Sequence, residues 1–177
     1  MQVHDLTTRR LRFRKLELKD AKAWEEFLSD PQAVKFFLPI EDVKQYAIEW
    51  MEKQSNRYEK DGFGLFALIE KNSGEFIGQC GLMIQEVDGI RELEIGYHLL
   101  PRFWKQGYAS EAAIACRNFA FENHLADSII SIIDPENFPS QKVANKNGMK
   151  KELETEWRGT KVFIYRITRD EWMKLRE

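Results

Sequence analysis

The residues best suited to chemistry lie in one segment, from Glu94 to Ala112. The segment is predicted to contain the end of a strand, a short loop with Gly107, and the start of a helix. Backbone N–H groups at a helix start point outward and carry the positive end of the helix dipole. A loop that leads into them can wrap a phosphate where small residues allow close approach. Gly107 and Ala109 are small, and Lys105 adds a positive charge. The alternative is that Gly107 serves only a turn.

The rest of the sequence narrows the class of protein. Neither G-x-x-x-x-G-K-[ST] nor G-x-G-x-x-G after a strand is present, which argues against an NTPase or a dinucleotide-dependent oxidoreductase. The histidines and cysteines lack metal-ligand spacing, so we expect no metal. With 27 basic and 29 acidic residues, the net charge of −2 argues against a nucleic-acid partner.

The apolar pattern also bears on the location of the chain. No apolar run approaches the roughly 18–20 residues of a membrane span, and the N-terminus lacks the apolar stretch of a secretory signal. We therefore expect a cytoplasmic protein with no membrane partner. In that compartment Cys80 and Cys116 are expected to be reduced thiols.

The elements that must position these residues follow from apolar periodicity and turn signals, which predict one mixed α/β domain over 1–177, structured from about 9 to 175. Strands are expected over 9–16, 63–70, 76–85, 91–100, 128–133, 150–157 and 160–167. Helices are expected over 20–29, 41–59, 109–123, 137–147 and 168–175. The order βααβββαβαββα implies antiparallel strands with one central parallel βαβ crossover.

Two motifs, one on each side of the predicted crossover helix, carry a family resemblance. Trp104-Lys-Gln-Gly-Tyr-Ala109 is similar to the pyrophosphate loop Q/R-x-x-G-x-G/A of the GNAT N-acetyltransferases. The wider segment from Glu94 to Ala112 resembles the RimJ/RimL-like branch of that family. Asn137-Phe-Pro-Ser140, followed by Lys146-Asn-Gly-Met149, is similar to N-x-x-S…K-x-G-[FM] of the same branch. The resemblance covers nearly the whole chain and implies a GNAT-like fold.

The resemblance implies that acetyl-CoA is the cosubstrate and that an amine accepts its acetyl group. In the family, the strands on either side of the crossover splay apart and the pantetheine arm lies in the gap. Trp104 departs from the motif, which has Gln or Arg there, but backbone donors do most of the binding. The residues expected to bind acetyl-CoA are Leu99 and Leu100 through their backbone, Trp104, Lys105, Gln106, Gly107, Tyr108 and Ala109 around the pyrophosphate, and Asn137 and Ser140 toward the pantetheine.

The reaction needs a base, because an amine attacks a thioester only in its neutral form and a lysine-like amine is mostly protonated at pH 7. Glu94 is the first candidate, at a position like the general-base glutamate of histone-acetylating relatives. A structural or water-holding role is its alternative. Many relatives place a general-acid tyrosine where this chain has Ala144. Ser140 offers a hydroxyl instead, or else bonds the local backbone at a helix start.

Three further features need an interpretation, and two of them have an alternative. His98 shares the strand face of Glu94 and is either a proton relay or a packing residue. The apolar run Phe36-Phe37-Leu38 is either core or a wall of the acceptor site. The arginines that alternate over 9–14 are interpreted as a solvated strand face.

The predicted function is therefore an N-acetyltransferase that acts by direct attack. Its acceptor is expected to be a primary amine, either a protein N-terminus or a small molecule, and the protein is expected to be a monomer or a homodimer. The alternative is a non-catalytic acyl-CoA sensor or an interaction module on the same fold.

Overall fold

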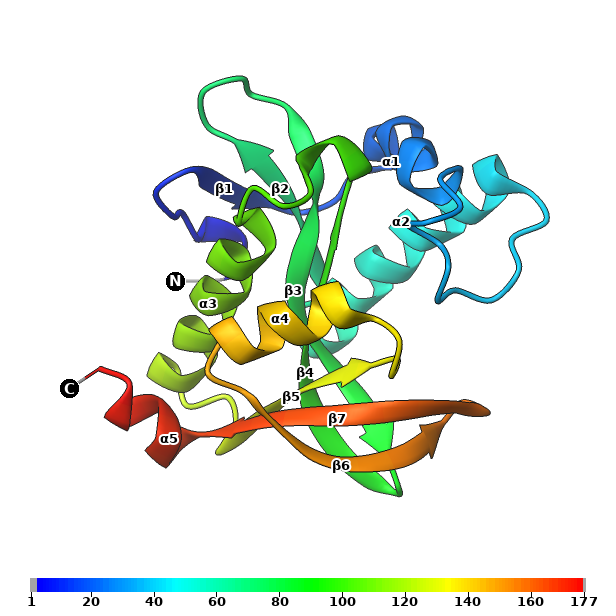
Figure 1. The fold of residues 1–177 in the computed structure, drawn as a ribbon. Helices are drawn as coiled ribbons and strands as arrows, with labels where there is room; N and C mark the ends of the chain where they lie inside the picture. Colours follow the sequence, from blue (N-terminus) through cyan, green and yellow to red (C-terminus); the bar gives the residue numbers. More distant parts are fainter. Residues whose placement is uncertain (1–2, 177) are drawn as a thin grey trace.

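The computed structural model describes residues 3–176 and contains one seven-stranded sheet with helices on both faces (Figure 1). The strands are β1 (Leu11–Arg14), β2 (Leu65–Glu70), β3 (Phe76–Val87), β4 (Ile90–Leu99), β5 (Ser128–Ile133), β6 (Lys150–Trp157) and β7 (Thr160–Thr168). The helices are α1 (Ala21–Leu28), α2 (Val43–Asp61), α3 (Tyr108–Glu122), α4 (Phe138–Lys146) and α5 (Arg169–Lys174). Short 3-10 helices cover Val3–Asp5, Leu18–Asp20 and Pro101–Phe103. The predicted order of strands and α-helices is confirmed.

The sheet has the strand order β1-β2-β3-β4-β5-β7-β6, and β4 and β5 form its parallel pair. The two strands pair only at Glu94 and Ile130. Figure 1 shows β5 leading away from the end of β4 that precedes α3. One residue further along, the Ser131 hydroxyl donates to the Ile95 carbonyl at 2.9 Å, in place of a continued backbone ladder. The predicted splay of these two strands is therefore confirmed.

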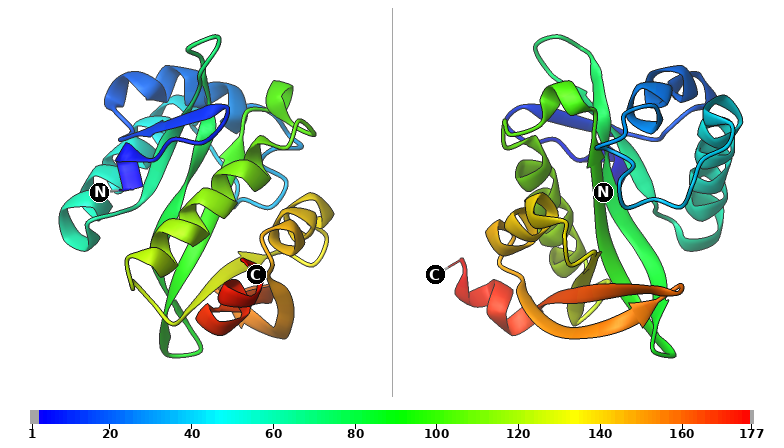
Figure 2. Two further views of the ribbon diagram at one scale, coloured as in Figure 1. Left: turned by 90° about the vertical axis from the view of Figure 1, so that its left-hand side faces the viewer. Right: turned by 45° about the vertical axis from the view of Figure 1, so that its right-hand side comes forward.

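The helices divide between the two faces of the sheet, and Figure 2 shows α1 and α2 on one side and α3 and α4 on the other. Along β4, Leu93 and Ile95 pack in the cluster that contains the small residues of α3. Because side chains alternate along a strand, Glu94 and His98 lie on the opposite face. That face is covered by α1 and α2, whose apolar residues form the second cluster with β2 and β3.

Two short sequence patterns form the turn and the helix cap that are typical of them. The hairpin between β3 and β4 turns at Asp88 and Gly89, whose φ angles of 50° and 76° match the left-handed geometry of an Asp-Gly turn. Thr168 caps α5 and forms a capping box with Glu171. The strand expected over 9–16 is shorter, since the Leu16 amide bonds the Tyr58 hydroxyl at 3.1 Å rather than a strand neighbour.

Two further observations concern the thiols and the helices. Cys80 and Cys116 are free and buried, with their Sγ atoms 3.7 Å apart. Within residues 3–176, no helix is long and apolar enough to cross a bilayer.

Candidate active site

The loop between β4 and α3 ends in an uncapped helix start. Gly107, the residue before α3, has φ 83°, and Lys105 has φ 61°, so two left-handed residues turn the chain into the helix. No side chain caps this N-terminus. The first amides of α3 therefore have no partner within the helix and can bind an anion. A Cβ at Gly107 would meet one neighbour within 4 Å, Arg10 Nη2 at 3.4 Å, so this side of the loop is open.

The side chains of the loop mainly hold the loop itself. Trp104 Nε1 donates to the Leu99 carbonyl at 2.7 Å, which ties the loop to the end of β4. Gln106 Nε2 donates to the Arg102 carbonyl at 3.0 Å. The Tyr108 side chain is buried in the core. An anion at this loop would therefore meet backbone N–H groups rather than these three side chains.

Arg10 fixes the loop from outside, so the interpretation of the N-terminal arginines as a solvated face holds for Arg9 and Arg12, which are exposed, but not for Arg10. Arg10 Nε lies 2.7 Å from the Glu111 carboxylate in the first turn of α3, and Nη1 donates to the Gln106 carbonyl at 2.9 Å. Its guanidinium stacks 4.1 Å above the Tyr108 ring. Arg14 also has a partner, Asp20, at 2.6 Å. The structure gives Arg10 its role because β1 lies next to the loop.

The backbone at the end of β4 is partly engaged within the protein. The Leu100 amide donates to the Ile77 carbonyl at 2.9 Å, and the Leu99 carbonyl accepts the Trp104 indole. A carbonyl oxygen has two lone pairs, so the Leu99 carbonyl retains one acceptor position. Both leucine side chains are buried.

Glu94 lies where β4 and β5 separate, and its side chain is buried. Gln85 Nε2 donates to its carboxylate at 2.7 Å. Burial raises the pKa of Glu94. Hydrogen bonds from Gln85 and the Ile132 amide lower the pKa in part, and so do the positive charges of Arg57 and Arg158. The net pKa is above the ordinary value, which makes the carboxylate a stronger proton acceptor.

Glu92, on the same strand face, differs from Glu94 in its environment. Arg166 lies 2.7 Å from the Glu92 carboxylate and donates to both of its oxygens. Glu92 therefore forms an ion pair with a residue of β7. Glu94 is the buried carboxylate at the point where β4 and β5 separate.

The start of α4 approaches β4 from the α3 side. Asn137 caps α4, and its Oδ1 accepts from the Ser140 amide at 3.2 Å. The Tyr97 hydroxyl donates to the Ser140 carbonyl at 2.9 Å and so links β4 to α4. The Ser140 hydroxyl has no hydrogen-bond partner among residues 3–176. Ala144 is fully buried one turn later, within the core cluster that contains α3 residues.

His98 lies among aromatic rings rather than in a polar relay. The rings of Trp24, Phe27, Phe37 and Trp50 surround it with centroids 5.5–6.1 Å away. Burial lowers the pKa of His98 to about 4, so it is neutral at pH 7. This environment favours the packing interpretation. Phe37 belongs to the same apolar cluster, whereas Leu38 is 80% exposed.

Several residues near the site have no individual signal in the sequence. Arg10 and Glu111 are separated by about 100 residues, and Gln85 and Arg158 belong to different hairpins. Tyr97 stands in the first motif, but its contact with α4 needs the folded chain. Charge or hydrogen-bonding capacity alone does not identify such partners, because residues of these types are common on solvated faces.

Comparisons with known proteins agree with this geometry. A family model described as "Acetyltransferase (GNAT) domain" matches residues 10–150, so the chain belongs to the GNAT acetyltransferase family. An uncharacterized N-acetyltransferase of Bacillus licheniformis, p20, is 35% identical over 150 residues, which make up 83% of this chain and 83% of p20. The uncharacterized N-acetyltransferase YnaD of Bacillus subtilis (strain 168) is 30% identical over an alignment of 179 residues, which covers 94% of this chain and 98% of YnaD.

Solved structures show the same fold. An acetyltransferase from Agrobacterium tumefaciens has a TM-score of 0.78 at 26% identity, over 92% of each chain. RimJ of Mycobacterium smegmatis, solved in complex with CoA-disulfide, has a TM-score of 0.74 at 23% identity, over 97% of this chain and 91% of RimJ. The predicted family, fold class and enzyme class are confirmed, and the protein is an acetyltransferase that uses acetyl-CoA.

Proposed function

We propose that the protein transfers the acetyl group of acetyl-CoA directly to a primary amine. One observation carries the proposal: the open, uncapped start of α3 and the buried Glu94 carboxylate lie at opposite ends of the segment where β4 separates from β5. The first can hold a pyrophosphate and the second can accept a proton. The gap between the two strands is a place for the arm that connects phosphate to thioester.

The proposed step keeps atoms and charges balanced. The neutral amine attacks the acetyl carbonyl, a C–N bond forms, and the C–S bond breaks to release CoA as a thiolate. Glu94 accepts the amine proton, directly or through water. The Ser140 hydroxyl, which has no protein partner in the described part of the chain, is positioned at the start of α4 to donate a hydrogen bond to the leaving sulfur. A weak donor suffices, since a thiol pKa of about 8.5 makes thiolate a good leaving group near neutral pH.

The proposed acetyl-CoA contacts are mostly backbone groups. The amides from Lys105 to Ala109 face the pyrophosphate, and the exposed Lys105 side chain adds positive charge. Trp104, Gln106 and Tyr108 act indirectly by holding the loop. The Leu99 carbonyl has an acceptor position for a pantetheine amide, next to Leu100 in the same strand end. Asn137 acts by capping α4, which places Ser140.

A non-catalytic acyl-CoA sensor is the second candidate, and Ala144 is the observation in its favour. Ala144 is buried where many relatives have a general-acid tyrosine. Turnover of acetyl-CoA separates the two functions. Release of CoA thiol that depends on an added amine supports the enzyme, and tight CoA binding without turnover by any amine supports the sensor.

Gly107 provides the test of the binding loop. Glutamate at this position would place bulk and negative charge on the open side of the loop, so Gly107→Glu should weaken CoA binding at least ~10-fold, about 1.4 kcal/mol. Calorimetry on the folded variant measures this. Gly89→Glu is the matched control, since Gly89 has a similar φ of 76° and open surroundings at the β3–β4 turn. Equal CoA affinity in both variants would contradict the loop assignment.

A further inference from the structure

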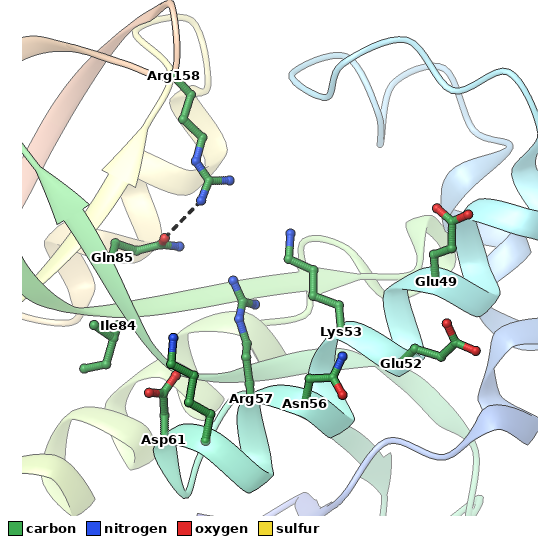
Figure 3. Close-up of a pocket in the computed structure, with 10 residues that line it drawn as sticks. Glu49, Glu52, Lys53, Asn56, Arg57, Asp61, Ile84, Gln85 and Arg158 are labelled. Carbon is green, nitrogen blue, oxygen red and sulfur yellow. Dashed lines mark hydrogen bonds between the residues drawn. The ribbon is translucent and has the colours of Figure 1, made fainter.

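A pocket of about 400 Å³ opens between α2, β3 and the turn that joins β6 to β7 (Figure 3). Lys53 and Arg57 from α2 and Arg158 from the turn line it. Figure 3 shows the charged ends of these three side chains directed into one open space. The pocket lies on the sheet face covered by α1 and α2, which is also the face of Glu94.

The three cations have no carboxylate within ion-pair distance in the described part of the chain. Arg57 Nη1 contacts Gln54 Oε1 at 3.3 Å, and Arg158 Nη2 contacts Gln85 Oε1 at 3.5 Å, both neutral amides. Burial, and then repulsion from the two arginines, lowers the pKa of Lys53. Like charges that face one space repel each other, so an anion between them would be stabilising.

The acidic residues of the pocket form no ion pair with this cluster. Asp61 lies 3.9 Å from Arg91, and its charge acts on Arg57 only from beyond ion-pair distance. Glu49 accepts a hydrogen bond at 2.9 Å from a glutamine one turn earlier in α2. Glu49 and Glu52 lie on the side of the pocket away from Arg158 (Figure 3). The positive charge is therefore concentrated at the end of the pocket formed by β3 and the turn.

Gln85 joins this end of the pocket to the proposed base. Its Nε2 donates to the Glu94 carboxylate at 2.7 Å, and its Oε1 faces Arg158. A buried carboxylate thus lies behind the pocket wall, and three cations lie in front of it. This arrangement is the electrostatic complement of a molecule that carries an amine and, a few bonds away, a carboxylate.

We infer that the acceptor is a primary amine bearing a carboxylate, which Lys53, Arg57 and Arg158 bind while the amine faces Glu94. This inference rests on the proposed acetyl transfer to an amine. The carboxylate can belong to a small amino acid or to an acidic side chain near a peptide N-terminus. The same cluster repels a polyamine, which carries positive charge along its whole length.

Matched acceptors test the inference directly. Initial rates of CoA thiol release are compared for 4-aminobutyrate and its neutral amide, and for the peptides Ser-Glu-Glu and Ser-Gln-Gln with amidated C-termini. Spermidine is the cationic comparison. In at least one pair, kcat/KM should be at least ~10-fold higher for the carboxylate form, about 1.4 kcal/mol, and the preference should fall with added salt. The pair with the larger preference identifies the source of the carboxylate. Equal or higher rates for the neutral forms or for spermidine would overturn the inference.

Charge-removing variants locate the effect in the pocket. Arg158→Gln and Lys53→Gln should each raise KM for the preferred carboxylate acceptor about 10-fold, while KM for its neutral partner changes less than about 2-fold. Lys44→Gln removes an exposed charge from the same helix, outside the pocket, and should behave as wild type. If the pocket variants change KM for the carboxylate acceptor and for its neutral partner equally, the cluster does not bind the carboxylate.

A binding measurement separates this inference from the proposed function. Calorimetry with N-acetyl-4-aminobutyrate and acetyl-Ser-Glu-Glu amide, in the presence of CoA, needs no turnover. Saturable binding of either probe that Arg158→Gln weakens supports the anion site even if no amine is acetylated. Turnover of amines without such binding of either probe overturns the inference and leaves the proposed function intact.

Discussion

Replacing Glu94 with glutamine tests the proposed base with little change in shape. The carboxylate accepts from Gln85 Nε2 at 2.7 Å and from the Ile132 amide. The glutamine oxygen keeps one of these bonds, and its amide nitrogen leaves the other donor unpaired, at a cost of about 1–3 kcal/mol. Removal of a buried charge offsets part of that cost, because burial is what raises the pKa of Glu94. We therefore expect Glu94→Gln to fold and to bind CoA with near wild-type affinity.

The kinetic effect should be larger than the structural one. Loss of a general base lowers kcat by roughly 10²–10⁴, or about 2.7–5.4 kcal/mol in the activation free energy. The deficit should shrink as the pH rises from 7 toward 10, because more of the amine is then already neutral. Thiol-release rates across that pH range measure the effect, and calorimetry measures CoA binding in parallel.

Glu92→Gln is the matched control for this variant. Glu92 lies on the same face of β4 but pairs with Arg166 at 2.7 Å, so its loss should affect stability more than turnover. A kcat for Glu94→Gln within about threefold of wild type at pH 7, or a fall in CoA affinity equal to the fall in rate, would refute the role of Glu94 as base and favour a structural one.

Three other predictions concern the remaining site residues. Ser140→Ala should lower kcat about tenfold, roughly one hydrogen bond to the leaving sulfur, and steady-state rates that do not change would leave Ser140 a helix-start residue. Arg10→Gln should raise the Kd for CoA about 3–10-fold by freeing the loop and Glu111, with kcat at saturating acetyl-CoA unchanged; calorimetry that finds wild-type affinity would contradict this. His98 has a folded-state pKa of about 4, below its ordinary value, so the unfolded chain takes up its proton first and stability falls as the pH drops from about 6.5 toward 4. In His98→Gln the fall in Tm over that range should be smaller, and an identical fall would contradict the buried neutral state.

The secondary-structure elements and the two motifs could be predicted from the sequence, because both depend on neighbours along the chain. The alternation in β4 and the small-residue stripe in α3 set the period and face of each element. Asp88-Gly89 and the Thr168–Glu171 box are complete within four residues or fewer, so their turn and cap could be predicted without a tertiary model. Gly107 could be singled out for the same reason, since a small residue in a loop that leads into a helix is a local feature.

Tertiary structure alone decided which charges meet. The alternating polarity of the sequence around Arg10 predicts a solvated side chain, yet β1, which begins one residue later, places Arg10 against Glu111, about 100 residues away in sequence. Likewise, only the folded sheet brings Gln85 between Glu94 and Arg158, and only packing against α1 and α2 makes His98 neutral. Burial and the pairing of distant charges depend on how elements pack against each other, and a pattern along one strand carries no information about the element on the other side.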